Sequence, residues 1–214
     1  MKKLSRKTKS IIATASILTV VGVSGILAYF TDTATVTNHA KMGIVDIDLK
    51  EYMIDEDGNK VPWQDKTNIV PGEVISKIPE INCETGAVDC YIRAKVEISC
   101  RDESLQSNSQ MLTLDNLNVN EDDWYYCESD GYFYYKTILT DKSNPIEIFS
   151  EVTIPSTLNN VWSLEEFSID VKAEAIQSKN FTPNFTAGTT EPWPGITQSD
   201  IQECIYPDHV KYKD

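Results

Sequence analysis

The sequence contains few of the residues that enzymes use for metal-dependent or base-catalysed hydrolysis. Its 214 residues include only two histidines, His39 and His209, which lie far apart and form no His-Glu-x-x-His motif. A zinc protease of that type needs two imidazoles one helical turn apart, and a serine hydrolase needs one that is positioned as a base. Gly-rich phosphate loops and carboxylate pairs at a recognisable spacing are also missing. We therefore expect a protein that is not an enzyme and that uses no cofactor.

Basic residues are scarce as well. The chain has 19 Lys and Arg against 33 Asp and Glu, which gives a formal net charge of −14. Five of the basic residues and none of the acidic ones lie in the first 28 residues, so residues 29–214 have a formal charge of −19. An acidic surface repels phosphate groups and anionic lipid heads, which disfavours nucleic-acid binding. Self-association would then depend on pH and divalent cations, although the charge also fits plain solubility.

The N-terminus has the layout of a secretory signal peptide. It begins with five basic residues, Lys2, Lys3, Arg6, Lys7 and Lys9. An uncharged run of 18 residues, 10–27, follows, and Ala28 is the small residue expected before a cleavage site. A transmembrane anchor is the alternative, because about 20 apolar residues span a bilayer, but serines, threonines and glycines dilute this run. We predict a signal-peptide helix over residues 1–28, cleavage between Ala28 and Tyr29, and membrane contact only before cleavage.

Several short motifs are shared with one group of exported bacterial proteins. They lie at residues 28–38, at 42–49, in the Val-Pro-Gly-Glu turn at 70–73, in Tyr-Ile-Arg-Ala-Lys-Val at 91–96, and at 123–124, 131–136 and 173–177. On these motifs the chain resembles the TasA/camelysin family, and the resemblance covers about residues 10–182. The resemblance implies a jelly-roll fold and a location in the extracellular matrix or on the cell surface of a Gram-positive-type bacterium. It implies as partners a SipW-type signal peptidase, further copies of the chain, and other matrix proteins or polysaccharide.

Alternating apolar residues predict an all-β protein. Period-two patterns occupy residues 43–54, 73–81, 90–100, 124–138, 146–154 and 167–176. The range 124–138 holds a hairpin, so the pattern predicts about seven or eight short strands with turn signals between them. Such a series favours an antiparallel β-sandwich, and the family resemblance implies that the sandwich is jelly-roll-like. In the clearest strand, Arg93, Lys95 and Glu97 are expected on one face, with Arg93 solvated or ion-paired rather than catalytic.

The chain divides by composition into four parts. They are the signal peptide at 1–28, the mature N-terminal segment at 29–42, the β-sandwich domain at 43–182 with an irregular insertion at about 101–122, and a loop-rich tail at 183–214. A short helical turn is expected at 198–204 within the tail. The length after the leader fits one domain with one core.

The cysteines are odd in number, so they cannot all pair within one chain. The five are Cys83, Cys90, Cys100, Cys127 and Cys204. Cys83 and Cys90 flank a Gly-containing turn between two strand-like segments, so a disulfide across this loop is geometrically plausible. Reduced thiols that pack as small apolar side chains are the alternative. The spacings do not match a zinc site, and no metal site is predicted from cysteine or histidine.

The acidic run after the first expected strand has two interpretations. Asp55, Asp57 and Asn59 imitate the alternating oxygen ligands of an EF-hand loop. However, Lys60 and Lys66 stand where that loop needs glycine and a bidentate glutamate, so these are weak calcium candidates. The Asp-Gly and Gly-Asn pairs instead predict a tight hairpin turn.

The segment after the cleavage site is a candidate donor strand. Its residues include Tyr29, Phe30, Thr31, Asp32 and Val36. Residues 29–40 favour extended structure but have too little apolar surface for an independent core strand, so they suit addition to a neighbouring copy's sheet edge. Head-to-tail addition of this kind builds filaments rather than closed rings. The alternative is that the segment folds onto its own subunit or stays disordered.

These observations predict a secreted structural protein of the extracellular or biofilm matrix that assembles into filaments. Two other classes stay open. One is a camelysin-like cell-surface metalloprotease, which the resemblance implies. The other is a non-polymerising adhesin or carbohydrate-binding module that stacks sugars on the aromatic residues at 124–135, although cross-strand packing is the commoner use of alternating Tyr and Phe.

Overall fold

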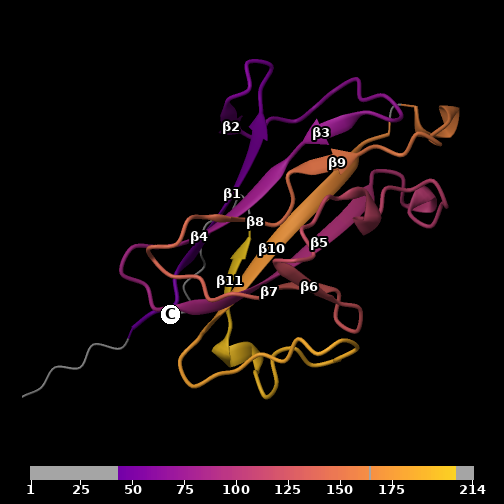
Figure 1. The fold of residues 1–214 in the computed structure, drawn as a ribbon. Coiled ribbons are helices and arrows are strands. Elements are labelled where there is room, and N and C mark those ends of the chain that lie inside the picture. Colours follow the sequence, from indigo (N-terminus) through magenta and orange to yellow (C-terminus); the bar gives the residue numbers. More distant parts are fainter. Residues whose placement is uncertain (1–42, 164, 206–214) are drawn as a thin grey trace, which may run out of the picture. The chain divides into compact units, whose positions relative to one another are not determined.

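The computed structural model describes residues 43–163 and 165–205 (Figure 1). The chain divides into two units, Met1–Met42 and Gly43–Asp214, and the described residues all belong to the second. The expected signal-peptide helix, the cleavage site and the candidate donor strand therefore lie outside the described residues. Within residues 43–163 and 165–205, no helix has the length and apolar character needed to cross a membrane.

The described residues form an all-β fold of antiparallel strands, as the alternating pattern predicts. The four-stranded sheet has the order β2 (Lys60–Pro62), β1 (Ile47–Ile54), β4 (Ile78–Cys83), β8 (Ile146–Glu147). The five-stranded sheet has the order β11 (Gln202–Ile205), β10 (Phe167–Gln177), β5 (Cys90–Cys100), β7 (Tyr132–Tyr135), β6 (Trp124–Cys127). A two-stranded sheet pairs β3 (Val74–Ser76) with β9 (Glu151–Thr153). The arrangement is sandwich-like, because residues of both larger sheets share one apolar core.

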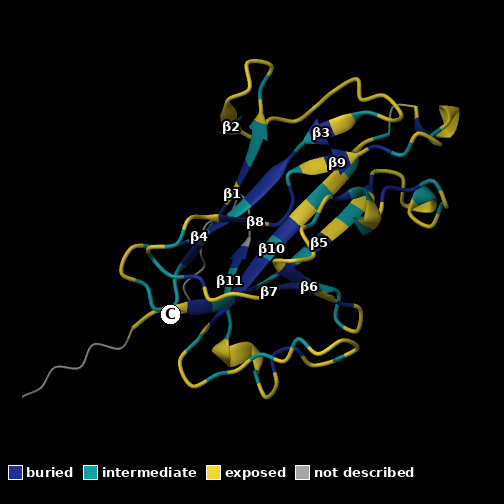
Figure 2. Ribbon diagram, viewed as in Figure 1, coloured by how far each residue is buried: buried dark blue, intermediate teal, exposed yellow. Residues whose placement is uncertain are grey.

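The core follows from the period of two along each strand. In β5 every second residue from Cys90 to Val96 is buried, whereas Arg93, Lys95 and Glu97 lie on the opposite face, as predicted. Figure 2 shows the banding along β10, where exposed and intermediate residues alternate in the first part of the strand and mainly buried residues follow. The inward residues of β5 pack with those of β1, such as Ile47 and Leu49, in a single cluster.

The structure differs from the sequence prediction at residues 146–154, where one strand was expected. This segment forms β8 and β9 in two different sheets, and residues 73–81 are likewise split into β3 and β4. All four pieces keep one register, since Ile81 faces Ile146 in β4–β8 and Ile75 faces Val152 in β3–β9. The interruption spans Lys77 to Pro79 and the facing residues 148–150. Pro79 has no N–H to donate to the ladder, and Ser150 donates its N–H to the Asn118 side chain. The four pieces are therefore one long ribbon with a break.

The connecting regions contain short 3₁₀ helices in place of longer elements. They are η1 (Glu103–Leu105), η2 (Leu114–Asn116), η3 (Asn160–Trp162) and η4 (Gln198–Asp200). The expected helical turn at 198–204 is shorter than predicted, because η4 is followed directly by β11. Residues 202–205 thus add an edge strand to the larger sheet, where the sequence predicted loop-rich structure.

A core truncation tests this packing. Ile92 is fully buried at the centre of β5, so we expect Ile92→Ala to lower the free energy of unfolding by about 2–5 kcal/mol through lost burial and a residual cavity. Val161→Ala is the matched control, because Val161 is 58 % exposed and its truncation should change stability by less than about 0.5 kcal/mol. Equal effects in denaturant titrations of the two variants would contradict the described core.

Candidate functional site

The sequence-predicted assembly and cleavage residues lie outside the described residues. They are Ala28, Tyr29, Phe30, Thr31, Asp32 and Val36. Their roles stay predictions. The structure does, however, describe the sheet edges to which an added strand would pair.

The outer edge of β1 has no described strand beside Ile47 and Leu49, although these residues are only 0 % and 2 % exposed. Asp46 accepts a backbone hydrogen bond from Glu84 of the β4 side, so the alternation of an antiparallel ladder directs the backbone groups of Ile47 and Leu49 away from β4. On that outer side β2 pairs only with residues 52–54, and Trp63 donates its N–H to the Glu51 carbonyl. Within the described part of the chain, Ile47 and Leu49 therefore have no strand partner on their outer side.

On the opposite side of the sandwich, a hydrogen bond joins the two larger sheets. There the indole N–H of Trp124, at the start of β6, donates to the backbone carbonyl of Glu147 in β8 at 3.0 Å. This bond occupies an outward carbonyl of β8 and joins the two sheets at this side. A polar groove of about 340 Å³ lies here, and its lining includes Asn118, Asn120, Tyr135 and Glu147.

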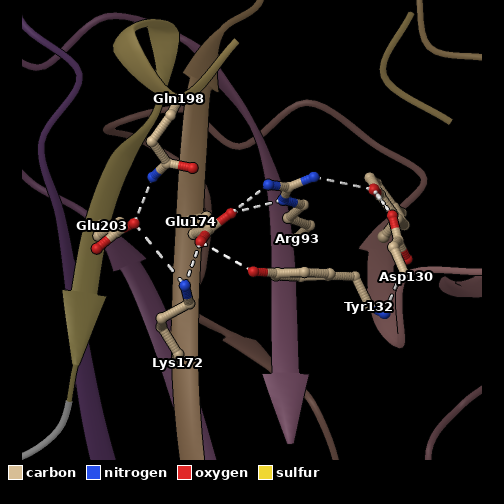
Figure 3. A network of polar contacts seen from close by, with 8 residues as sticks. Arg93, Asp130, Tyr132, Lys172, Glu174, Gln198 and Glu203 are labelled. Atoms are coloured by element: carbon tan, nitrogen blue, oxygen red, sulfur yellow. Dashed lines mark hydrogen bonds and ion pairs between the residues drawn. The ribbon is translucent and has the colours of Figure 1, made fainter. Parts of the chain in front are cut away.

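The outer face of the five-stranded sheet has a buried cluster of charged and aromatic residues (Figure 3). Glu174 of β10 lies directly opposite Arg93 of β5, and only 1 % of the Glu174 side chain is exposed. The Arg93 guanidinium is 2.6 Å from one carboxylate oxygen. The other oxygen accepts from the Tyr132 hydroxyl at 3.0 Å and lies 2.5 Å from the Lys172 ammonium. Two cations and a phenol thus compensate one buried carboxylate.

Aromatic rings enclose the guanidinium of this cluster. Its central carbon lies 4.1 Å from the ring centre of Tyr132 and 4.9 Å from that of Trp193. Arg93 also donates to the Tyr134 hydroxyl, which in turn donates to Asp130 at 2.6 Å. Trp193 belongs to the segment between β10 and β11, which therefore covers this face of the sheet. Its Nε1 is buried and has no hydrogen-bond partner among residues 43–163 and 165–205.

The charges of the cluster shift each other's pKa. Burial alone would raise the pKa of Glu174, but the Lys172 hydrogen bond and the Arg93 charge bring it below its ordinary value of 4.5. Burial opposes the charge of Lys172 as well, yet its bonds to Glu174 and Tyr132 raise the Lys172 pKa above 10.5. Burial and the Asp130 hydrogen bond raise the pKa of Tyr134. The shifts therefore favour the ionised form of Glu174 and the protonated forms of Lys172 and Tyr134, which are the forms that these bonds require.

This arrangement of mutually compensated charges and rings fixes the local structure. Arg93 is ion-paired, which is one of the two states predicted from its strand position. The sequence analysis missed Glu174, because a single glutamate in an alternating strand looks like an ordinary solvent-facing residue. Only the register with β5 shows that it faces a cation.

The aromatic hairpin is packed rather than open. Trp124 and Tyr134 are 3 % and 1 % exposed, and Tyr132 lies against Arg93, so these rings have no free face for a sugar. Tyr126 is the more exposed ring of the hairpin. The predicted use in cross-strand packing is observed, with Trp124 facing Tyr135 and Tyr126 facing Phe133.

The weak calcium candidates form a hairpin turn between β1 and β2. One carboxylate oxygen of Asp55 accepts the backbone N–H groups of Asp57 and Asn59, at 3.0 and 2.8 Å. Gly58 has a φ of 82°, which glycine tolerates best. The Asp55 carboxylate is thus used within the turn. In the described part of the chain, no group of three or more His, Cys, Asp or Glu side chains is placed to hold a metal ion.

All five cysteines are buried, and Cys83, Cys90, Cys100 and Cys127 are free thiols in this structure. Cys83 at the end of β4 and Cys90 at the start of β5 interact with each other inside the main core. Cys100 and Cys127 bond to other groups, namely the Asp102 carbonyl and the Ser129 hydroxyl.

Comparison of the chain with protein-family models, with curated proteins and with solved structures gives no match.

The buried ion pair gives a pH-dependent prediction. Glu174→Gln should lower the free energy of unfolding at pH 7 by about 3–5 kcal/mol, because Arg93 and Lys172 lose their counter-charge. Since the folded pKa of Glu174 is below 4.5, its stabilisation is complete above that pH and is lost as the pH falls through the folded pKa. Urea titrations should show a smaller acid loss in Glu174→Gln than in the parent chain.

The control for this measurement is Glu97→Gln, on the exposed outer face of β5. The Glu97 side chain is 68 % exposed and pairs with Lys95, so its loss should cost about 0–1 kcal/mol. An acid profile of Glu174→Gln that parallels the parent would show that the cluster contributes no pH-dependent stability.

Proposed function

We propose that this chain is an exported structural protein of the extracellular matrix, with a jelly-roll-like sandwich that assembles by N-terminal strand addition. The observation that supports it best is the outer side of β1 at Ile47 and Leu49, where no described strand pairs and which lies close in sequence to residues 29–42. A sheet edge with unpaired N–H and C=O groups is a template for another strand. The signal-peptide layout before Ala28 supports export.

Pairing between copies is favoured by the path of the chain into β1. Ile44 accepts a hydrogen bond from Val88 and Asp46 accepts one from Glu84, so residues 44–46 continue the line of β1. For the preceding segment to pair with the outer edge of its own β1, the chain would have to reverse before Ile44. Addition to the β1 edge of another copy needs no such reversal.

Apolar exposure at this place supports the same assignment. Ile44 is 53 % exposed just before β1, and an added strand that runs past Ile47 would cover it. The neighbouring edge of the other sheet is β11, which contacts β1 and lies on the same side of the sandwich. An incoming strand would therefore lie beside both β1 and β11.

Head-to-tail addition uses two different surfaces of each copy, so it extends into a filament. The formal charge of −19 over residues 29–214 opposes the approach of copies until it is neutralised or screened. Assembly is expected to be stronger at acidic pH or with divalent cations than in neutral, low-salt buffer.

Truncation tests the role of the N-terminal segment. The chain that starts at Tyr29 should form filaments in negative-stain electron microscopy, and the chain that starts at Gly43 should stay monomeric. Both should be examined across pH and calcium concentration. If both stay monomeric under every condition, the filament mechanism is wrong.

A point substitution tests the acceptor edge. Ile44→Lys places a charge beside the open part of β1 without removing a core side chain, and lysine at a sheet edge disfavours strand addition. We expect filament growth, followed by light scattering, to slow several-fold. Val161→Lys adds the same charge at a site of similar exposure outside this edge and should leave growth unchanged. Equal slowing by both variants would indicate a charge effect and not an edge effect.

A further inference from the structure

Cys83 and Cys90 form a pair that the proposed function does not use. Cys83 ends β4 in the four-stranded sheet, and Cys90 begins β5 in the five-stranded sheet. Their side chains are 3 % and 0 % exposed and belong to the same core cluster. The two thiols interact with each other inside that cluster.

The loop between the two cysteines is fixed by hydrogen bonds. Ala87 donates its N–H to the Glu84 carbonyl, and Gly86, with a φ of 85°, makes the reversal. Cys90 is held on its other side by two backbone hydrogen bonds with Leu139. The backbone on both sides of this loop is therefore fixed, and the two thiols meet within one core cluster.

We propose that Cys83 and Cys90 are oxidised to an intramolecular disulfide while the chain folds outside the cytoplasm, so that a covalent bond joins the two sheets of the sandwich. This inference takes from the proposed function only the export of the chain, and does not depend on filament assembly. Cys100 and Cys127 bond to Asp102 and Ser129 and lie in other clusters. Cys204 shares the main core cluster, so peptide mapping must distinguish a bond to Cys204 from the proposed pair.

The reaction is a thiol–disulfide exchange. The thiolate of one cysteine attacks an external disulfide, either of a small-molecule thiol or of an exported oxidoreductase, and displaces one of its sulfurs as a thiolate. The second cysteine then attacks this mixed disulfide and releases the other sulfur. The protein loses two thiol protons and two electrons, and the external disulfide is reduced to two thiols.

Burial restricts when this exchange can occur. The thiolate is the attacking species, and burial raises the pKa of both cysteines in the folded chain, most strongly that of Cys90. An external disulfide also has no path to side chains that are almost fully covered. The pair is therefore oxidised before the core is fully folded. Once the sandwich has folded, burial prevents further exchange, so the cysteines keep the redox state that they had at that point.

Thiol counting tests the proposal directly. The full-length chain is unfolded in denaturant and refolded by dilution into detergent-containing buffer, with either a glutathione redox mixture or a strong reductant. Free thiols are then alkylated in denaturant and the protein is digested for mass spectrometry. We expect three alkylated cysteines and one peptide pair joined through Cys83 and Cys90 after oxidative refolding, against five alkylated cysteines after reductive refolding. Five alkylated cysteines in both samples, or a different joined pair, would overturn the proposal.

Thermal unfolding provides a second measurement on the same samples. The oxidised protein should melt about 5–10 °C above the reduced protein, because the bond restricts the unfolded chain. Cys83→Ala should abolish this difference, whereas Cys100→Ala, at another buried cysteine, should preserve it. If Cys83→Ala does not fold, peptide mapping of the parent chain still decides the question. Filament formation plays no part in either readout, so failure here is separate from failure of the assembly mechanism.

Discussion

The pairing of β5 with β10 is the interaction on which the other features depend. Eleven residues of each strand face each other in one uninterrupted antiparallel register, from Phe167 opposite Cys100 to Gln177 opposite Cys90. One face of this ladder supplies Ile92, Ala94 and Ala173 to the core between the sheets. The other face places Arg93 opposite Glu174. A shift of one residue would exchange the two faces, so apolar burial and charge pairing select the same register.

The charge pairing explains how the five-stranded sheet can be covered on both faces although the outer faces of β5 and β10 have polar residues. The outer face of β5 and β10 has the polar residues expected of a solvent-facing surface, yet the segment around Trp193 lies over it. Arg93 makes this possible, since its guanidinium is flat enough to lie between aromatic rings while its edges bond to Glu174 and Tyr134. Lysine at this position would lack that planar shape. A second buried ion pair is arranged in a similar way. Lys77 pairs with Glu51 of β1, and its ammonium group lies over the Trp63 ring.

The sequence predicted what depends on local periodicity and missed what depends on distant pairing. The alternation in residues 91–98 is long enough to predict both faces of β5. The break at Pro79 was not predicted in residues 146–154, because the missing N–H belongs to the partner strand and not to the segment that it interrupts. Gln202–Ile205 is too short for a periodic signal, and it becomes a strand because β10 offers it an edge. Within the candidate site, Arg93 was evident from its strand, whereas Glu174 required the register. The hairpin at Asp55 was predictable, since its turn chemistry lies within six consecutive residues.

The indole of Trp124 has a consequence for the architecture of any assembly. Its bond to the Glu147 carbonyl ties β6 to β8 and leaves the opposite side, with β1 and β11, as the side at which a strand can be added. Under the proposed mechanism, a subunit that adds strands at this side accepts one incoming neighbour there. Under the proposed mechanism the polymer would then be linear and unbranched, and its two tips would differ chemically, so that each fibre would have a defined polarity.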